Sequence, residues 1–171
     1  QHGVQEVFNV NEIYPGVNFS VRGGEVVCLY GDTGTGKTSL YQGWTVKLTD
    51  PVQRKKDGFR PLRVFFNSPE MSNDNMMDRF LQIAYNLAVS EEDQVDQIQA
   101  AQEAGWLSKE RVERVMQGIH MSTHPLSTDE LYDAMNAVRP DVLVIDPLED
   151  VVVSGGGYDR VADQKTLITA L

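Results

Sequence analysis

The sequence predicts an α/β fold in which a mostly parallel sheet is covered by helices on both faces. Apolar runs of strand length alternate with segments of helical periodicity along the 171 residues, a pattern typical of parallel sheets with helical crossovers. A glycine-rich stretch, Gly31 to Thr38, stands between an apolar run and a helix-compatible run. A later apolar run, 142–145, ends in Asp146. Both features follow predicted strands at the carboxyl end, where α/β sheets bind ligands.

The chain begins with a segment, 1–24, that we interpret as a lead-in with a short strand at Val17–Val21. A glycine turn then leads into a predicted strand at Glu25–Tyr30. Cys28, the single cysteine, lies inside this strand and is expected to be a buried, inert thiol.

The glycine-rich stretch is followed by a predicted helix over Ser39–Leu48 that ends by Asp50-Pro51, since the residue before a proline disfavours helical backbone. The next segment, Gln53–Arg60, is polar and carries four cations: Arg54, Lys55, Lys56 and Arg60. It is either a solvated connection, which is the simpler interpretation, or a loop that faces nucleic acid.

A second buried strand is predicted at Leu62–Phe66. Ser72 is placed to cap the helix that follows, whose apolar stripe from Met76 to Ala88 is expected in the core.

The remaining elements continue the alternation. They are a helix at 90–104 with a possible capping box Ser90-x-x-Asp93, a helix at Ser108–Met116, a strand at 118–122, a helix opened by the capping box Ser127-x-x-Glu130, a strand at 141–146, a loop at 154–157 and a helix at 159–171. His120 and His124 have no metal-ligand partners at useful spacing, so we expect them to be structural or exposed.

Composition restricts the class of protein. A net charge of −10 argues against a surface that coats nucleic acid, although a local contact is compatible with it. No apolar run approaches the roughly 20 residues that span a bilayer, and no signal peptide is visible, so a cytoplasmic location is expected. The chain starts at Gln1 and stops at Leu171 inside a helical pattern. We therefore interpret 25–171 as one incomplete domain.

The stretch Gly31 to Thr38 fits the phosphate-binding pattern G-x-x-x-x-G-K-[ST]. Backbone N–H groups and a helix N-terminus converge there, which suits the phosphates of ATP. Lys37 can reach the β- and γ-phosphates, and the Thr38 hydroxyl can bind Mg²⁺. The predicted nucleotide-binding residues are Gly31, Asp32, Thr33, Gly34, Thr35, Gly36, Lys37, Thr38 and Ser39.

Hydrolysis also needs a carboxylate near the metal and a general base. Asp146 is the predicted metal carboxylate, acting through water, and Pro147 follows it, so no acid is adjacent. Glu70, just after the second strand, is the predicted base that polarises the attacking water. Glu149 and Asp150 are weaker alternatives. Lys37, Glu70 and Asp146 are thus the predicted catalytic residues.

Three segments in order resemble the RecA-type ATPase core of DnaB-like replicative hexameric helicases. They are Val27–Leu40, the segment Phe65 to Phe80 with its Glu70-Met71 pair and Arg79, and Val142–Leu148 with its Asp-x-Leu ending. The resemblance implies a homo-hexamer that hydrolyses ATP with Mg²⁺ between subunits, translocates on single-stranded DNA and can meet a primase. It also places a sensor residue and an arginine finger beyond Leu171, so this chain alone is expected to hydrolyse ATP poorly unless it oligomerises.

The prolines before Glu70 and after Asp146 are not the commonest residues at these positions in that family, and Asp146-Pro147-Leu148 also resembles RepA-like plasmid or phage replication ATPases acting in a host cytoplasm. A clock-type, KaiC-like regulatory ATPase and a nucleotide-binding scaffold without turnover are further alternatives. An ABC-transporter domain is disfavoured because no LSGGQ precedes Asp146 and no glutamate follows it directly. A small-molecule kinase is disfavoured because no arginine-rich lid is visible.

Overall fold

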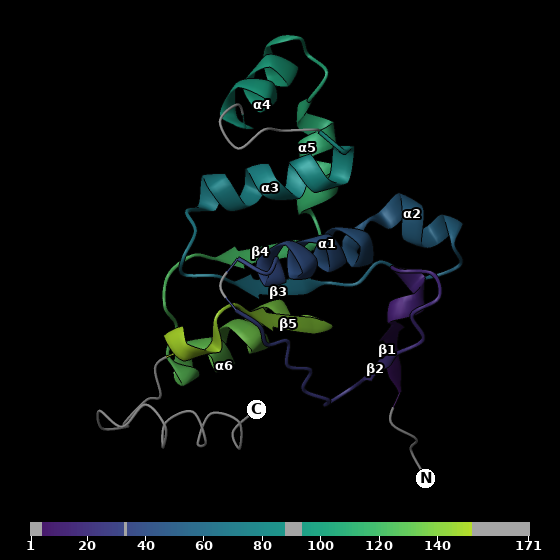
Figure 1. Cartoon of the computed structure of the whole chain (residues 1–171), viewed down its shortest axis with the longest axis vertical. Helices are drawn as coiled ribbons and strands as arrows, with labels where there is room; N and C mark the ends of the chain where they lie inside the picture. The colour runs from purple at the N-terminus through teal and green to yellow at the C-terminus, as the bar shows by residue number, and fades with distance from the viewer. Residues whose placement is uncertain (1–4, 33, 88–93, 152–171) are drawn as a thin grey trace.

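The computed structural model describes residues 5–32, 34–87 and 94–151, and a parallel sheet of three strands lies at its centre (Figure 1). The strand order is β4 (Ile119–Ser122), β3 (Val64–Asn67), β5 (Val142–Ile145). The register places the last residue of β3, Asn67, beside Ser122 of β4 and Ile145 of β5. The three strands therefore end level with one another, and the residues that follow them meet at one edge of the sheet.

Helices cover both faces of this sheet (Figure 1). α1 (Lys37–Thr49) and α3 (Asn73–Tyr85) lie on one face, and α6 (Thr128–Val138) lies on the other. The chain runs from β3 to β4 through α3, α4 (Gln94–Glu103) and α5 (Lys109–Met116), and then returns past β3 to β5 through α6. Because parallel crossovers are right-handed, these opposite moves place their helices on opposite faces. The predicted α/β architecture is confirmed.

Two neighbouring phenylalanines of β3 pack on opposite faces of the sheet, since successive strand side chains point to opposite sides. Phe66 packs edge-to-face on Phe80 of α3, with ring centroids 5.5 Å apart, in the cluster shared by α1, α3 and α5. Phe65 packs instead with Leu126 and with Leu131 of α6. All four residues of β3 are buried, as expected for a central strand.

Side-chain caps set the starts of three helices, and two of these caps are predicted from the sequence. Ser72 accepts a hydrogen bond from the N–H of Asn75 at the start of α3, and Ser108 caps α5. Ser127 and Glu130 form the predicted capping box of α6. The predicted stripe is in the core where the structure describes it, with Met76, Phe80 and Leu81 fully buried, and its last member, Ala88, lies outside the described residues.

The N-terminal segment packs onto the same body. β1 (Glu6–Asn9) pairs antiparallel with β2 (Ser20–Arg22) around a short 3-10 turn, η1 (Val10–Glu12). The strand predicted at Val17–Val21 is thus shifted to Ser20–Arg22, and its partner β1 was not predicted. Phe8, Val10 and Ile13 form a cluster with Leu48 of α1 and Leu62 before β3.

The strand predicted at Glu25–Tyr30 is wrong. Residues 25–32 form no regular element, Val26 is 60% and Tyr30 96% exposed, and Cys28 is exposed rather than buried. A strand is stable only when a neighbouring strand takes up its backbone hydrogen bonds. Within the described residues, β5 pairs with β3 alone, so this apolar run has no strand beside it.

The polar segment after α1 is not a plain connection. It contains α2 (Pro51–Lys56), opened by Asp50, whose carboxylate accepts from the N–H groups of Val52 and Gln53. η2 (Leu148–Asp150) closes the described part. The predicted box Ser90-x-x-Asp93, the loop at 154–157 and the helix at 159–171 lie outside the described residues. No helix among the described residues has the length and apolar character needed to cross a membrane.

Candidate functional site

The glycine-rich stretch forms a tight loop that runs directly into α1. Gly34 and Gly36 have positive φ angles of 82° and 86°, a left-handed backbone that favours glycine. The hydroxyl of Thr35 donates to the carbonyl of Asp32 at 2.8 Å and closes the loop. Thr33 lies outside the described residues. The helix begins at Lys37, two residues earlier than the sequence predicts.

The first turn of α1 is suited to bind an anion. Gly36 is the N-cap and has no side chain with which to cap the helix, and no acidic residue stands in the first turn. The leading N–H groups of a helix lack partners within it, and the helix dipole favours negative charge at this end. A phosphate would satisfy these donors, and Ser39 adds an exposed hydroxyl in the same turn.

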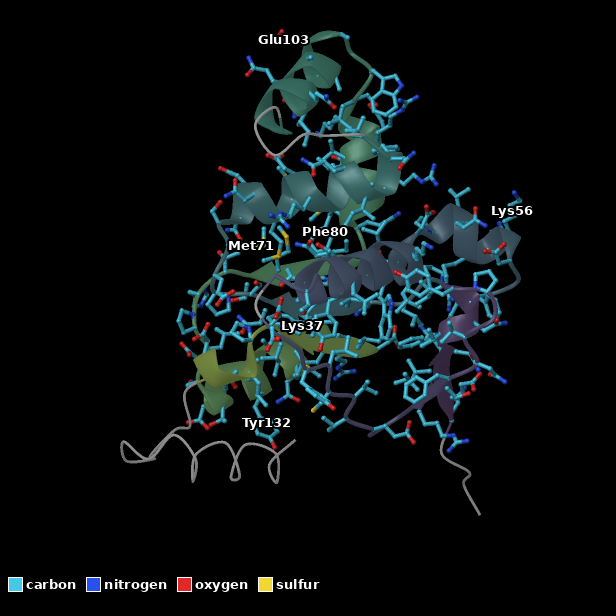
Figure 2. The ribbon with its side chains drawn as sticks, viewed as in Figure 1. Lys37, Lys56, Met71, Phe80, Glu103 and Tyr132 are labelled. Atoms are coloured by element: carbon cyan, nitrogen blue, oxygen red, sulfur yellow. The ribbon has the colours of Figure 1, made fainter. Side chains whose placement is uncertain are left out.

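Lys37 lies on this first turn, near the centre of the molecule (Figure 2). Its ammonium turns back to the loop, where it donates to the carbonyl of Gly31 and, at 2.9 Å, to that of Asp32. The loop thus holds the cation in place. Phosphate binding would exchange these neutral carbonyls for charged oxygens, which are stronger partners for an ammonium group.

Thr38 and Asp146 come together although they are 108 residues apart in the chain. The Thr38 hydroxyl donates to Asp146 Oδ2 at 2.6 Å. Asp146 directly follows β5, is only 9% exposed, and is fixed by its own N–H, which donates to the carbonyl of Asn67 at 2.9 Å. The sheet therefore presents one carboxylate to the start of α1.

A hydroxyl and a carboxylate form a donor set that fits Mg²⁺. This ion prefers oxygen ligands, keeps several waters and is usually held by one or two protein groups together with phosphate oxygens. Within the described residues there is no group of three or more His, Cys, Asp or Glu side chains that could hold a metal. The Thr38–Asp146 pair beside a phosphate-binding turn thus suits Mg²⁺ bound with a nucleotide.

Glu70 lies in the exposed turn between β3 and α3. Among the described residues its carboxylate has no hydrogen-bond or ion-pair partner, so it is free to act on a ligand, and no contact joins it to Asp146. Asp150 of η2 is half-buried, and the Glu149 side chain lies outside the described part.

The position of Glu70 is set by its neighbours. Ser68 is buried, and its carbonyl accepts from the Met71 N–H at 3.4 Å. The Met71 sulfur accepts from Gln42 Nε2 at 3.7 Å, which joins the turn to α1, and Met71 packs against the core cluster (Figure 2). Gln42, only 1% exposed, was not predicted as part of this region. The one signal in the sequence is that Gln42 is a polar residue in the helix that directly follows the glycine-rich loop.

Tyr41 borders the site on α1. Burial raises the pKa of its phenol, and a hydrogen bond with the Leu29 backbone offsets part of that effect. The phenol therefore stays neutral near pH 7 and is a poor candidate for the general base.

The two histidines are not part of this arrangement. His120 is half-buried within β4, and His124 is exposed in the connection to α6. Both positions agree with the structural or exposed role expected for them.

Comparison with protein families finds a match to the family described as AAA domain over residues 9–171. The match covers nearly the whole chain and identifies a P-loop ATPase domain. A comparison with curated proteins found no match.

Proposed function

This chain belongs to the AAA domain family, and we propose that it binds Mg²⁺-ATP on the loop and first helical turn from Gly31 to Ser39 and hydrolyses it. The observation that carries this proposal is the 2.6 Å hydrogen bond between Thr38 and Asp146 at an uncapped helix N-terminus. Any buried carboxylate needs a hydrogen-bond partner, but the partner here stands on the uncapped first turn of α1. A nucleotide site needs a phosphate-binding turn, a hydroxyl and a carboxylate at one point.

Each group has a role in the proposed reaction. The N–H groups at the start of α1 and the Lys37 ammonium hold the phosphates and stabilise charge that develops on them. Thr38 and Asp146 would hold the Mg²⁺, Asp146 through water. When bound, this ion supplies positive charge beside the transferred phosphoryl group. Glu70 accepts the proton of the attacking water, and the anchored Met71 beside it fixes the turn that presents this carboxylate.

We infer further that this ATPase is the motor domain of a DnaB-like replicative helicase that moves on single-stranded DNA. The support is the Glu70-Met71 turn after a central strand, followed by a helix with Arg79. In this proposal the chain works as a homo-hexamer in which each ATP lies between two subunits. A primase is the proposed partner.

A second candidate is a regulatory, KaiC-like or RepA-like ATPase without a DnaB-type role. The contacts of the basic residues after α1 favour this second candidate. Arg54 is buried against Glu12, and Arg60 is bridged to Asp141, so only Lys55 and Lys56 of that group remain exposed and without an ion-pair partner among the described residues. Two lysines on a chain with a net charge of −10 offer a small electrostatic footprint for DNA.

Phosphate release from ATP, measured with and without single-stranded DNA and alongside a native mass, separates these candidates. Stimulation by DNA together with a ring supports the helicase. ATP hydrolysis at a rate that single-stranded DNA does not change supports the regulatory ATPase. ATP binding without turnover, with or without DNA, would refute hydrolysis.

The variant Glu70→Gln tests the proposed base. It should keep ATP affinity and lose about 10²–10⁴-fold in kcat, the usual contribution of a general base. Glu103→Gln is the matched control, because Glu103 lies on α4 far from Lys37 (Figure 2). Equal turnover in the two variants would exclude Glu70 as the base.

A further inference from the structure

A buried amide lies at the point where the three strands end. Asn67, the last residue of β3, is 0% exposed. Its Nδ2 donates to the carbonyls of His124, at 3.0 Å, and Ser122, at 3.4 Å. Its Oδ1 is buried and has no partner among the described residues.

The two carbonyl partners determine which atom of this amide is Nδ2 and which is Oδ1. Rotating the amide by half a turn would point Oδ1 at two carbonyl oxygens, which donate nothing. Oδ1 therefore faces away from β4. A buried acceptor without a partner destabilises the folded state, because it has lost its hydrogen bonds to water. Such groups are normally satisfied by a buried water, which makes two to four hydrogen bonds to polar atoms around it.

Asn67 is joined to the site on both sides. Its carbonyl accepts from the N–H of Asp146 at 2.9 Å, so it lies beside the residue that contacts Thr38. Glu70 follows three residues later, after the buried Ser68. The side-chain amide of Asn67 thus holds the connection from β4 to α6. The backbone carbonyl of Asn67 holds Asp146 at the end of β5.

We propose that Asn67 is a positioning residue of the ATPase site. Its Oδ1 accepts a hydrogen bond from a water bound at the carboxyl edge of the sheet, and this water completes the hydrogen bonds by which Asn67 fixes the strand ends that carry Asp146 and the Glu70 turn. The inference rests on the proposed function. Asn67 touches neither phosphate nor metal, and it acts through the bound water and through the strand ends that it ties together.

The first test is Asn67→Leu, which keeps the branching and the number of heavy atoms of the side chain and removes its donor and its acceptor. We expect kcat to fall about 10–100-fold, the usual effect of losing a residue that supports the groups in direct contact with a reaction, while the KM for ATP stays within about twofold. Asn67→Ser, whose hydroxyl can bind the same water, should recover part of kcat. Asn136→Leu on the exposed side of α6 is the matched control.

A purely structural amide would give a different result. Asn67→Leu would then lower the thermal stability and leave kcat unchanged below the melting transition, which would overturn the proposal. The same holds if Asn67→Ser is no better than Asn67→Leu.

A crystal structure of the unaltered chain gives a second, independent measurement, which remains decisive if Asn67→Leu fails to fold. We expect a water oxygen within hydrogen-bond distance of Oδ1, about 2.7–3.2 Å. A dry Oδ1 would overturn the proposal whatever the kinetics show. If the unaltered protein binds ATP without any turnover, the proposed function itself fails and the positioning role with it. Normal turnover in Asn67→Leu overturns the positioning role alone.

Discussion

The ion pair between Glu12 and Arg54 is expected to be among the costliest contacts to break. The side chains are only 11% and 7% exposed. Arg54 also donates through Nε to the carbonyl of Arg60 at 3.0 Å and stacks on the Phe59 ring. Glu12 in turn accepts from the N–H of Asn9 at 2.7 Å. Arg54→Met would keep the apolar stem and leave the Glu12 carboxylate buried without its cation.

Removing one partner of a buried pair destabilises a protein by about 3–5 kcal/mol, because the remaining charge is uncompensated. For a domain of this size each kcal/mol lowers Tm by about 2–4 °C, so Arg54→Met should melt roughly 6–20 °C below the unaltered chain. Urea unfolding followed by circular dichroism measures the loss directly. Lys55→Met is the matched control on the same helix, and since Lys55 is exposed it should change stability by less than about 0.5 kcal/mol.

A double-mutant cycle isolates the pair itself. Adding Glu12→Gln to Arg54→Met removes the stranded charge, so the double variant should recover about 1–3 kcal/mol relative to the sum of the two single changes. A loss below about 1 kcal/mol in Arg54→Met would refute this description of the pair. If that variant instead kept its stability and bound single-stranded DNA more weakly, Arg54 would have the nucleic-acid role that its sequence context left open.

Three further predictions concern the phosphate-binding loop, the amino end of β5, and α6. Lys37→Ala should weaken ATP binding about 10–100-fold in titration calorimetry, which corresponds to the 1.5–3 kcal/mol of a charged hydrogen bond. The hydrogen bonds from Arg60 lower the pKa of Asp141, so its stabilisation is present above the unfolded pKa near 3.9 and is lost as pH falls through the lower folded pKa. Asp141→Asn should therefore be less stable than the unaltered chain at pH 7 in urea unfolding, and about equal to it near pH 2. Ser127→Ala breaks the capping box of α6 and should cost about 1 kcal/mol in the same assay; no change would exclude a capping contribution.

The features that the sequence predicts well depend on short-range patterns. The glycine-rich loop, the caps at Ser72 and Ser127, and the core strands at β3 and β5 each follow from residues within a few positions of one another. In these cases local backbone chemistry and burial favour the same structure, so the pattern alone is sufficient.

The errors occur where a distant segment decides the outcome. Glu25–Tyr30 has strand composition, but no strand pairs with it in the part of the chain that the structure describes. Conversely, β1 forms because β2 lies beside it. Asp50-Pro51 predicts only the end of a helix when the proline alone is considered. It is also the start of α2, since an aspartate N-cap with proline at the first position is a helix-start signal.

Within the site, too, short-range patterns are predicted from the sequence and contacts between distant segments are not. The types of residue that bind a nucleotide are visible in the motif from Gly31 to Thr38. The contact between Thr38 and Asp146 depends on the order of the strands in the sheet, so no local sequence pattern predicts it. The sequence does not predict a role for Asn67, because an amide at the end of an apolar run has no distinctive pattern until its burial and its two carbonyl partners are known.

In the proposed site, Thr38 and Asp146 hold Mg²⁺ against a nucleotide bound at the start of α1. The most direct measurement is the affinity of the chain for ATP by titration calorimetry, with Mg²⁺ and with a chelator, for the unaltered protein and for Asp146→Asn. We predict that Mg²⁺ strengthens ATP binding to the unaltered chain and that Asp146→Asn loses this gain while it still binds ATP in the chelator. Equal dependence on Mg²⁺ in both proteins would show that Asp146 does not hold the metal, and no ATP binding to the unaltered chain would refute the nucleotide site itself.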